Sequence, residues 1–197
     1  MSRARSTFER LRAAGIPLWA AVLGVLPLPV WSAFHAIAAP APAWRAEYRP
    51  RAATDAGAPA VVFERQLGRY WDRNDRVVPG GAGVHAFSAR WLACASIEAA
   101  RDVPFMLVAS GSASFAIDGA PVLTIPAKNT RRSVGAVLHL EPGVHALSVT
   151  LDVIGWPSVA LQASFDGAPP VPLGSGRLAP GVRLAPPSAG AVPCPGG

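Results

Sequence analysis

Short segments with strand-like patterns recur between residues 60 and 165, and in most of them apolar and polar residues alternate. They are residues 60–67, 84–98, 103–109, 112–118, 121–125, 134–140, 147–153 and 158–165. A period of two places successive side chains on opposite faces of a half-buried β-strand, and turn-forming residues separate the segments. We therefore predict an all-β fold, an antiparallel β-sandwich of about 7 to 9 strands. One N-terminal transmembrane or signal helix precedes it.

The stretch from Phe105 to Gly119 is the centre of this pattern. An apolar run ends at Ser110-Gly111-Ser112, and a second segment places Phe115 and Ile117 on one face. Asp118-Gly119 then supplies the positive φ angles of a tight turn. We expect the two segments to fold back on each other, with the other strands packed around them.

Residues 1–39 carry either a membrane anchor or a signal peptide. No charged residue occurs between Arg12 and Arg45, a length that can span the roughly 30 Å of bilayer hydrocarbon. One interpretation is a basic cytoplasmic leader at 1–14 and an uncleaved transmembrane anchor at 15–39. The other is a signal peptide cleaved near Ala36-Ile37-Ala38. The first leaves a single-pass protein of the cell membrane with its domain outside the cytoplasm, and the second a secreted or periplasmic protein.

The rest of the chain divides into three parts. Residues 40–59 are a tether and domain entry, residues 44–167 the β-sandwich domain, and residues 168–197 a C-terminal tail rich in Pro and Gly. Such a tail lacks the apolar content to bury a core of its own, so it either dangles or lies along the domain. Gly68–Gly83 is expected to be a long loop.

The net charge does not favour nucleic-acid binding. Four arginines and one glutamate precede residue 13, and without them the formal net charge of +6 falls to +3. Beyond that leader, Arg131-Arg132 is the one cluster of basic residues. A basic groove is therefore not expected, and the sequence predicts no nucleic-acid partner.

Cys94 and Cys194 are the only cysteines. Two cysteines in an exported chain often form one disulfide. Cys94 also falls on the polar face of its predicted strand, where a returning tail can reach it. We predict a Cys94–Cys194 bond; the alternatives are two free thiols or a tail thiol bonded to another protein.

The segment from Tyr70 to Arg76 is the best candidate for a recognition surface. Aromatic rings stack on the apolar faces of sugars, while acids, amides and guanidinium groups take the hydroxyls. The candidate binding residues are Tyr70, Trp71, Asp72, Asn74 and Asp75, with Trp156 on a turn as a second candidate. The alternative is that Trp71 packs across the sandwich edge while the charged residues pair with one another in solvent.

A catalytic constellation is not recognisable. No nucleophile-elbow glycine pattern accompanies the Ser, His and Asp residues, and His139 and His145 have no third ligand in view for zinc. We expect no enzymatic activity, no cofactor and no metal ion.

Three short motifs resemble, in order and spacing, the protective-antigen fourteen-kilodalton-domain family. They are Phe87-Ser88-Ala89-Arg90-Trp91, the segment from Val108 that ends in Ile117-Asp118-Gly119, and Leu140-Glu141-Pro142-Gly143-Val144-His145. Ala46-Glu47-Tyr48 matches the usual opening of the module, so the resemblance covers about 44–167. It implies a β-sandwich of the kind attached to bacterial toxins, glycosidases, glycosyltransferases and yeast adhesins, in many of which the role is carbohydrate binding.

One departure from that family bears on function. The resemblance implies that sugar-binding members hold calcium with two consecutive aspartates just before the Ile-Asp-Gly strand. Here those positions are Ser110 and Gly111, which offer no negative charge to a cation that prefers anionic oxygens. We expect the calcium-dependent mechanism to be absent.

These features predict a non-catalytic, membrane-anchored extracytoplasmic module that binds saccharide or an envelope protein. The alternative is a structural or assembly subunit of a membrane complex, such as a glycosyltransferase or secretion assembly, with no ligand of its own.

Overall fold

The structure, a computed structural model, describes residues 41–50, 58–71, 87–153, 157–175, 178–188 and 194. Within these ranges the chain forms strands and no helix, so none of them contains an apolar helix long enough to cross a membrane. The predictions for residues 1–39 lie outside the described residues. So do those for Asp72, Asn74, Asp75 and Trp156.

Twelve strands lie in the described part of the chain. They are β1 (Trp44–Pro50), β2 (Ala60–Glu64), β3 (Gly68–Tyr70), β4 (Phe87–Ile97), β5 (Arg101–Ser110), β6 (Ser112–Ile117), β7 (Ala120–Ile125), β8 (Arg132–Leu140), β9 (Gly143–Asp152), β10 (Ser158–Ala163), β11 (Val171–Pro172) and β12 (Val182–Ala185). The predicted all-β fold is therefore confirmed for these residues.

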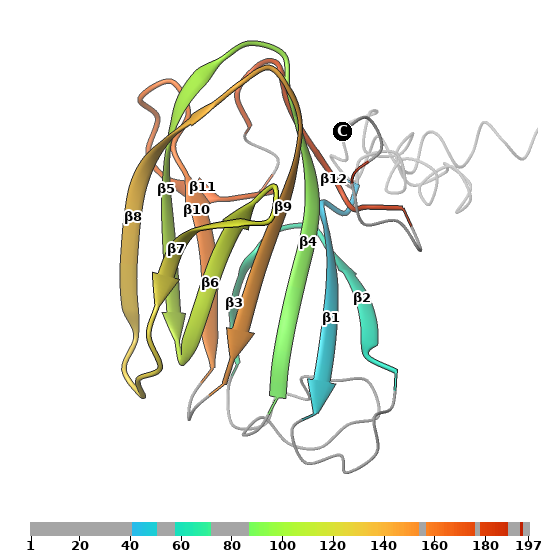
Figure 1. The fold of residues 1–197 in the computed structure, drawn as a ribbon, viewed down its shortest axis with the longest axis vertical. Helices are drawn as coiled ribbons and strands as arrows, with labels where there is room; N and C mark the ends of the chain where they lie inside the picture. Colours follow the sequence, from blue (N-terminus) through green and yellow to red (C-terminus); the bar gives the residue numbers. More distant parts are fainter. Residues whose placement is uncertain are drawn as a thin grey trace, which may run out of the picture. The chain divides into compact units, whose positions relative to one another are not determined.

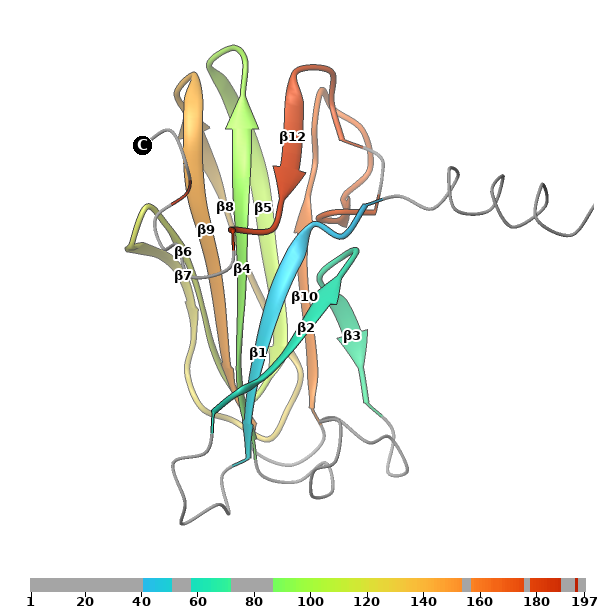
Figure 2. The same cartoon turned by 90° about the vertical axis from the view of Figure 1, so that its right-hand side faces the viewer.

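The strands form two antiparallel sheets that pack face to face (Figure 1). Sheet A has the order β2-β1-β4-β9-β6-β7, and β12 pairs with the end of β4 that β1 leaves free (Figure 2). Sheet B has the order β11-β10-β5-β8, and β3 pairs with the other end of β10. The predicted antiparallel sandwich is confirmed by this arrangement.

The alternation predicted for residues 84–98 is confirmed by the burial pattern of β4. Phe87, Trp91 and Ile97 are buried between the sheets, whereas Arg90 is exposed on the outer face. The inner faces of the two sheets meet in one apolar core, which removes these side chains from water.

Four strands lie where the sequence predicted none. β1 lies in the expected tether, β3 at the start of the expected loop, and β11 and β12 in the expected tail. The last three are only three, two and four residues long, and they form because β10 and β4 offer them free backbone edges. In β1 the alternation is present, with Trp44, Ala46 and Tyr48 buried, but the surrounding Arg and Pro residues hid it.

The predicted hairpin between Phe105 and Gly119 is wrong. β5 belongs to sheet B and β6 to sheet A, and the chain crosses from one sheet to the other at Gly111, whose φ is 109°. The two strands meet through their inner faces, where the ring centroids of Phe105 and Phe115 lie 5.2 Å apart. The turn at Asp118-Gly119 does join β6 to β7 as an antiparallel pair.

The tail lies along the domain, which is one of the two arrangements expected for it. Leu173 is buried and is held by three hydrogen bonds. Its carbonyl accepts from Trp44 Nε1 at 2.9 Å and from the Leu67 amide at 3.1 Å, and its amide donates to Leu161 O at 2.8 Å. The described part of the tail is therefore integral to the sandwich, and the domain extends beyond Gly167.

The predicted disulfide between Cys94 and Cys194 is confirmed. The two Cα atoms lie 5.7 Å apart, and both residues are buried. Cys94 lies on the outer face of β4, as its position in the alternation indicated.

Candidate functional site

Tyr70 and Trp71 lie next to each other at the end of β3 but differ completely in exposure. Tyr70 is 66% exposed, whereas Trp71 is 0% exposed. The Trp71 ring packs edge-on against Phe87, with 5.5 Å between the ring centroids. Trp71 is therefore a core residue, as the alternative interpretation held, and offers no ring face to a ligand. Tyr70 remains as an exposed aromatic candidate.

The carboxylate of Glu64, at the end of β2, links side chains of β1, β3 and β4 by hydrogen bonds. Its Oε1 accepts hydrogen bonds from the Tyr48 hydroxyl at 2.6 Å and from Arg69 Nη1 at 2.8 Å, and its Oε2 accepts from Trp91 Nε1 at 3.0 Å. Burial and the negative charge of Glu64 raise the pKa of Tyr48 above its ordinary range, so its hydroxyl stays protonated and donates.

This cluster also fixes Arg69. Its guanidinium is paired with Glu64 and lies 5.5 Å from the centre of the Trp71 ring. The ion pair neutralises the charge of Arg69, and the ring limits the positions that its side chain can take. The Arg69 side chain is therefore directed toward Glu64 and Trp71, whereas Tyr70, the next residue of β3, faces the other side of the strand.

A hollow of about 180 Å³ lies beside the exposed ring, and we name it the Tyr70 pocket. It is lined by Gly68, Arg69, Tyr70, Val108, Arg131, Ser158, Val159 and Ala160. These residues come from β3, β5, β10 and the residue before β8, so four segments far apart in the sequence build it.

The strand register explains the shape of the Tyr70 pocket. Tyr70 lies opposite Ser158, and Ser158 lies opposite Ser110. The two serine hydroxyls are buried and hydrogen-bond to each other, with 3.0 Å between their Oγ atoms. In the next row Gly68 lies opposite Ala160. These small side chains leave space beside the large Tyr70 ring.

Arg131 lines the pocket from the opposite edge of sheet B, where β8 lies. Arg132 pairs with Ala109, so Arg131 lies at the Ser110 end of β5. The connection between β7 and β8 is held at this end by the Gly111 amide, which donates to Lys128 O at 3.0 Å. Sequence reasoning noted Arg131 as part of a basic pair, but not as a neighbour of Tyr70.

Ser110 and Gly111, the positions where the resemblance expects aspartates, bring no carboxylate to this end of the sandwich. Among the residues that the structure describes, no group of three His, Cys, Asp or Glu side chains could hold a metal ion.

Two other hollows lack this combination of groups. One, of about 480 Å³, is lined mostly by apolar and proline side chains around Phe165 and Leu178. The other, of about 350 Å³, lies on the outer face of sheet A and is lined by Glu47, Arg49, Ser88, Ala89, Arg90, Thr150, Leu151 and Asp152, without an aromatic ring. The Tyr70 pocket alone among these three places an exposed aromatic ring beside hydroxyl and guanidinium groups.

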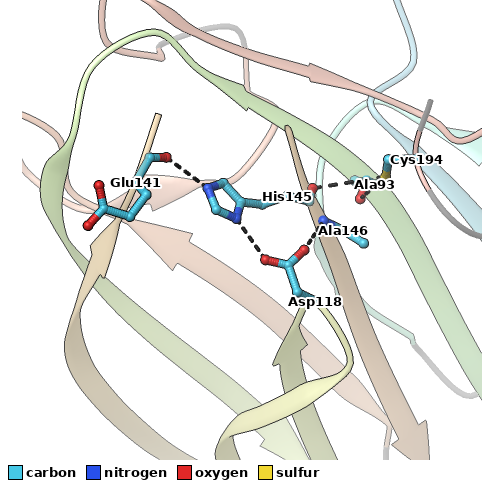
Figure 3. A network of polar contacts seen from close by, with 6 residues as sticks. All are labelled: Ala93, Asp118, Glu141, His145, Ala146 and Cys194. Carbon is cyan, nitrogen blue, oxygen red and sulfur yellow. Dashed lines mark hydrogen bonds and ion pairs between the residues drawn. The ribbon is translucent and has the colours of Figure 1, made fainter. Parts of the chain in front are cut away.

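His145 bridges two turns at the opposite end of the sandwich (Figure 3). Its Nδ1 lies 2.7 Å from Asp118 Oδ2 and its Nε2 lies 2.8 Å from Glu141 O, while Asp118 Oδ1 accepts from the Ala146 amide at 2.7 Å. Carboxylate and carbonyl oxygens both accept, so an imidazolium that donates from both nitrogens satisfies them. Partial burial, the largest single influence, lowers the pKa of His145, but the hydrogen bonds to Asp118 and Glu141 O and the two nearby negative charges together outweigh it and raise the pKa.

His139 lies on sheet B with a carboxylate partner of its own. Its Nδ1 lies 2.7 Å from Asp102 Oδ1, and this hydrogen bond raises the pKa of His139. The two histidines are therefore in separate sheets, in separate ion pairs, and neither lines the Tyr70 pocket.

No protein-family model matches the chain, and no curated protein does. Solved structures are similar in fold. The PA14 domain of the antifreeze protein MpAFP is 16% identical, with a TM-score of 0.53 over 66% of this chain and 86% of that one. The PA14 sugar-binding domain from an RTX adhesin is 12% identical, with a TM-score of 0.55 over 67% and 94%.

A third similar structure is an anti-sigma factor domain-containing protein from Clostridium clariflavum. It is 12% identical, with a TM-score of 0.51 over 66% of this chain and 44% of that one, so this chain spans less than half of its length. Identities this low bear on the fold alone. In fold the chain is similar to PA14 domains, the protective-antigen modules that its motifs resemble.

Proposed function

We propose that the chain is a non-catalytic module that binds saccharide in the Tyr70 pocket. The observation that carries the proposal is the exposed ring of Tyr70 beside a hollow that is also lined by Ser158 and Arg131. The ring offers a flat apolar face to the C–H side of a sugar, and the polar groups bond to its hydroxyls. The similarity in fold to a sugar-binding PA14 domain supports this class of ligand.

The size of the pocket restricts the ligand. A volume of about 180 Å³ is smaller than the roughly 300–1,000 Å³ of sites that enclose drug-sized ligands. The pocket therefore takes one sugar ring, or the end of a longer chain.

A glycan array probed with the full chain in detergent tests the proposal. We expect binding that Tyr70→Ala weakens roughly tenfold or more, because truncation removes the central aromatic contact. Val137→Ala is the matched control, since Val137 is also 64% exposed on sheet B but does not line the pocket. An array without signal, or an equal loss in both variants, overturns the proposal.

Calcium is not required in this proposal. Ser110 and Gly111 carry no carboxylate, so chelation with EDTA leaves the array signal unchanged. A signal that EDTA abolishes contradicts this part of the proposal.

The module is displayed outside the cytoplasm and is anchored by residues 15–39. The uncharged stretch between Arg12 and Arg45 and the disulfide support this location, because disulfides persist in oxidising compartments. In fractionated cells the chain stays in the membrane pellet after alkaline extraction, and its intact mass includes residues 1–39. A soluble chain that lacks these residues indicates signal cleavage instead.

A second candidate function, an assembly subunit that docks on an envelope protein, is favoured by one observation. Val61 and Phe63 are 44% and 53% exposed on β2, an edge strand of sheet A, and exposed apolar side chains on a free edge suit a protein partner. Phe63→Ser then removes a co-purifying membrane protein and leaves glycan binding intact. If it removes none, this candidate fails.

A further inference from the structure

The charge balance of the Tyr70 pocket indicates which class of sugar it takes. Of the lining residues that the structure describes, two are arginines and none is an acid. Arg69 is neutralised by Glu64 at 2.8 Å. Arg131 is exposed, and within the described residues no carboxylate lies close enough to it for an ion pair. Among the described residues, the pocket therefore has one guanidinium without an ion-pair partner.

The surroundings of Arg131 strengthen this positive charge. The segment from Pro126 to Ser133 contains Lys128, Arg131 and Arg132 and no acidic residue. All three basic residues are exposed. This loop is a local positive patch at the rim of the pocket, on a chain whose charge beyond the N-terminal leader is otherwise dispersed.

The arrangement across sheet B sets the length of the ligand. Strands lie about 4.8 Å apart, so Tyr70 on β3 and Arg131 beside β8 are separated by about three spacings, or roughly 14 Å between backbones. Both side chains are long, and the Ser158 and Ser110 hydroxyls lie between them. A ring stacked on Tyr70 can therefore direct a charged substituent toward Arg131.

We infer that the Tyr70 pocket selects a saccharide that carries a carboxylate, that is, a uronic acid residue; this rests on the proposed saccharide binding. A planar guanidinium takes a carboxylate through two parallel hydrogen bonds, which are stronger than bonds to neutral hydroxyls. The Tyr70 ring supplies stacking for any sugar, and Arg131 supplies the preference for the acid.

Trigalacturonic acid and its fully methyl-esterified form test the inference, because they differ only in charge and the ester groups. With the full chain in detergent, we expect the acid to bind about tenfold tighter or more than the ester. Arg131→Gln lowers the affinity for the acid to the level of the affinity for the ester. It leaves the affinity for the ester unchanged. Arg132→Gln, the neighbouring exposed arginine outside the pocket, changes either affinity by less than about threefold.

The outcomes separate this inference from the proposed function. If acid and ester bind equally and both depend on Tyr70, the charge preference is overturned and saccharide binding stands. Loss of acid binding in Arg132→Gln as large as in Arg131→Gln also overturns it, since diffuse charge then explains the preference. Tighter binding of a galactose 6-sulfate than of the uronate overturns the carboxylate assignment. If no glycan binds in any form, the proposed function itself fails.

Discussion

Cys194 is bonded to Cys94 in β4, and their Cα atoms lie 5.7 Å apart although 100 positions separate them in the sequence. Cys94 lies opposite Ala146 of β9 on one side and Ala185 of β12 on the other. The bond therefore fastens the tail to the centre of sheet A, beyond the point where β12 ends.

Removal of this bond is expected to destabilise the domain strongly. Cys94→Ser combined with Cys194→Ser lowers the free energy of unfolding by about 4 kcal/mol, since a bond across so long a loop restricts the unfolded chain. Urea unfolding of the oxidised wild type and the double variant measures the difference. Dithiothreitol lowers the wild type to the same level and leaves the double variant unchanged; equal stability before reduction contradicts the prediction.

Gly174 holds the tail close to the segment after β2. Its φ is +99°, and a Cβ at this position would collide with the Arg65 carbonyl and crowd Ala43. Gly174→Ala therefore lowers the free energy of unfolding by about 3 kcal/mol, from backbone strain and the steric clash together. Gly167→Ala is the control, because its φ is +75° in open space, and strain alone costs about 1 kcal/mol. Thermal unfolding of both variants shows whether Gly174→Ala is the more destabilising of the two.

Glu64 is expected to matter far more to stability than an exposed glutamate. Glu64→Gln lowers the free energy of unfolding by about 2–3 kcal/mol, because an amide has one acceptor oxygen for three donors that the carboxylate now satisfies. Glu98→Gln is the matched control. Its 3.6 Å pair with Arg183 is exposed, so it contributes no more than about 0.5 kcal/mol. Equal effects in a denaturant titration would refute the role of the buried cluster.

The hydrogen bonds of His145 give stability a pH dependence of defined sign. The pKa of His145 is raised in the folded state, so its contribution is complete below the unfolded value of about 6.5 and is lost as pH rises through the folded pKa. Urea midpoints therefore decline as the pH rises above about 6.5, and His145→Gln flattens this decline. His139→Gln, at an exposed ion pair, flattens it less. A wild-type midpoint that rises over this interval contradicts the assignment.

Alternation predicted which faces of β4 and β9 are buried. The inward faces of β4 and β9 were visible as Phe87, Trp91 and Val149 at even spacing, because the period of a strand is a local property. The pairing of β5 with β10 was not visible. Alternation determines the face that a strand buries, whereas its hydrogen-bonding partner depends on segments about fifty residues away.

The candidate site, like the fold, was predictable from the sequence only in part. Tyr70 could be selected from the sequence as a potential stacking residue, but its neighbour Trp71 has the same aromatic character and is buried. Composition cannot distinguish them, because exposure depends on which side of β3 the second sheet covers. Arg131 and Ser158 join the site only through strand register across sheet B.

The sequence by itself determined the β-class, the buried faces of strands such as β4 and β9, and the two cysteines available to close the tail, all of which depend on local spacing or on residue identity. Tertiary structure decided that the chain changes sheets at Gly111, that the tail completes both sheets, and that Tyr70 and Arg131 share one pocket. The reason is physical. Side-chain direction repeats along a strand, but neighbours across a sheet are chosen by long-range backbone hydrogen bonds and by the packing of one face on the other.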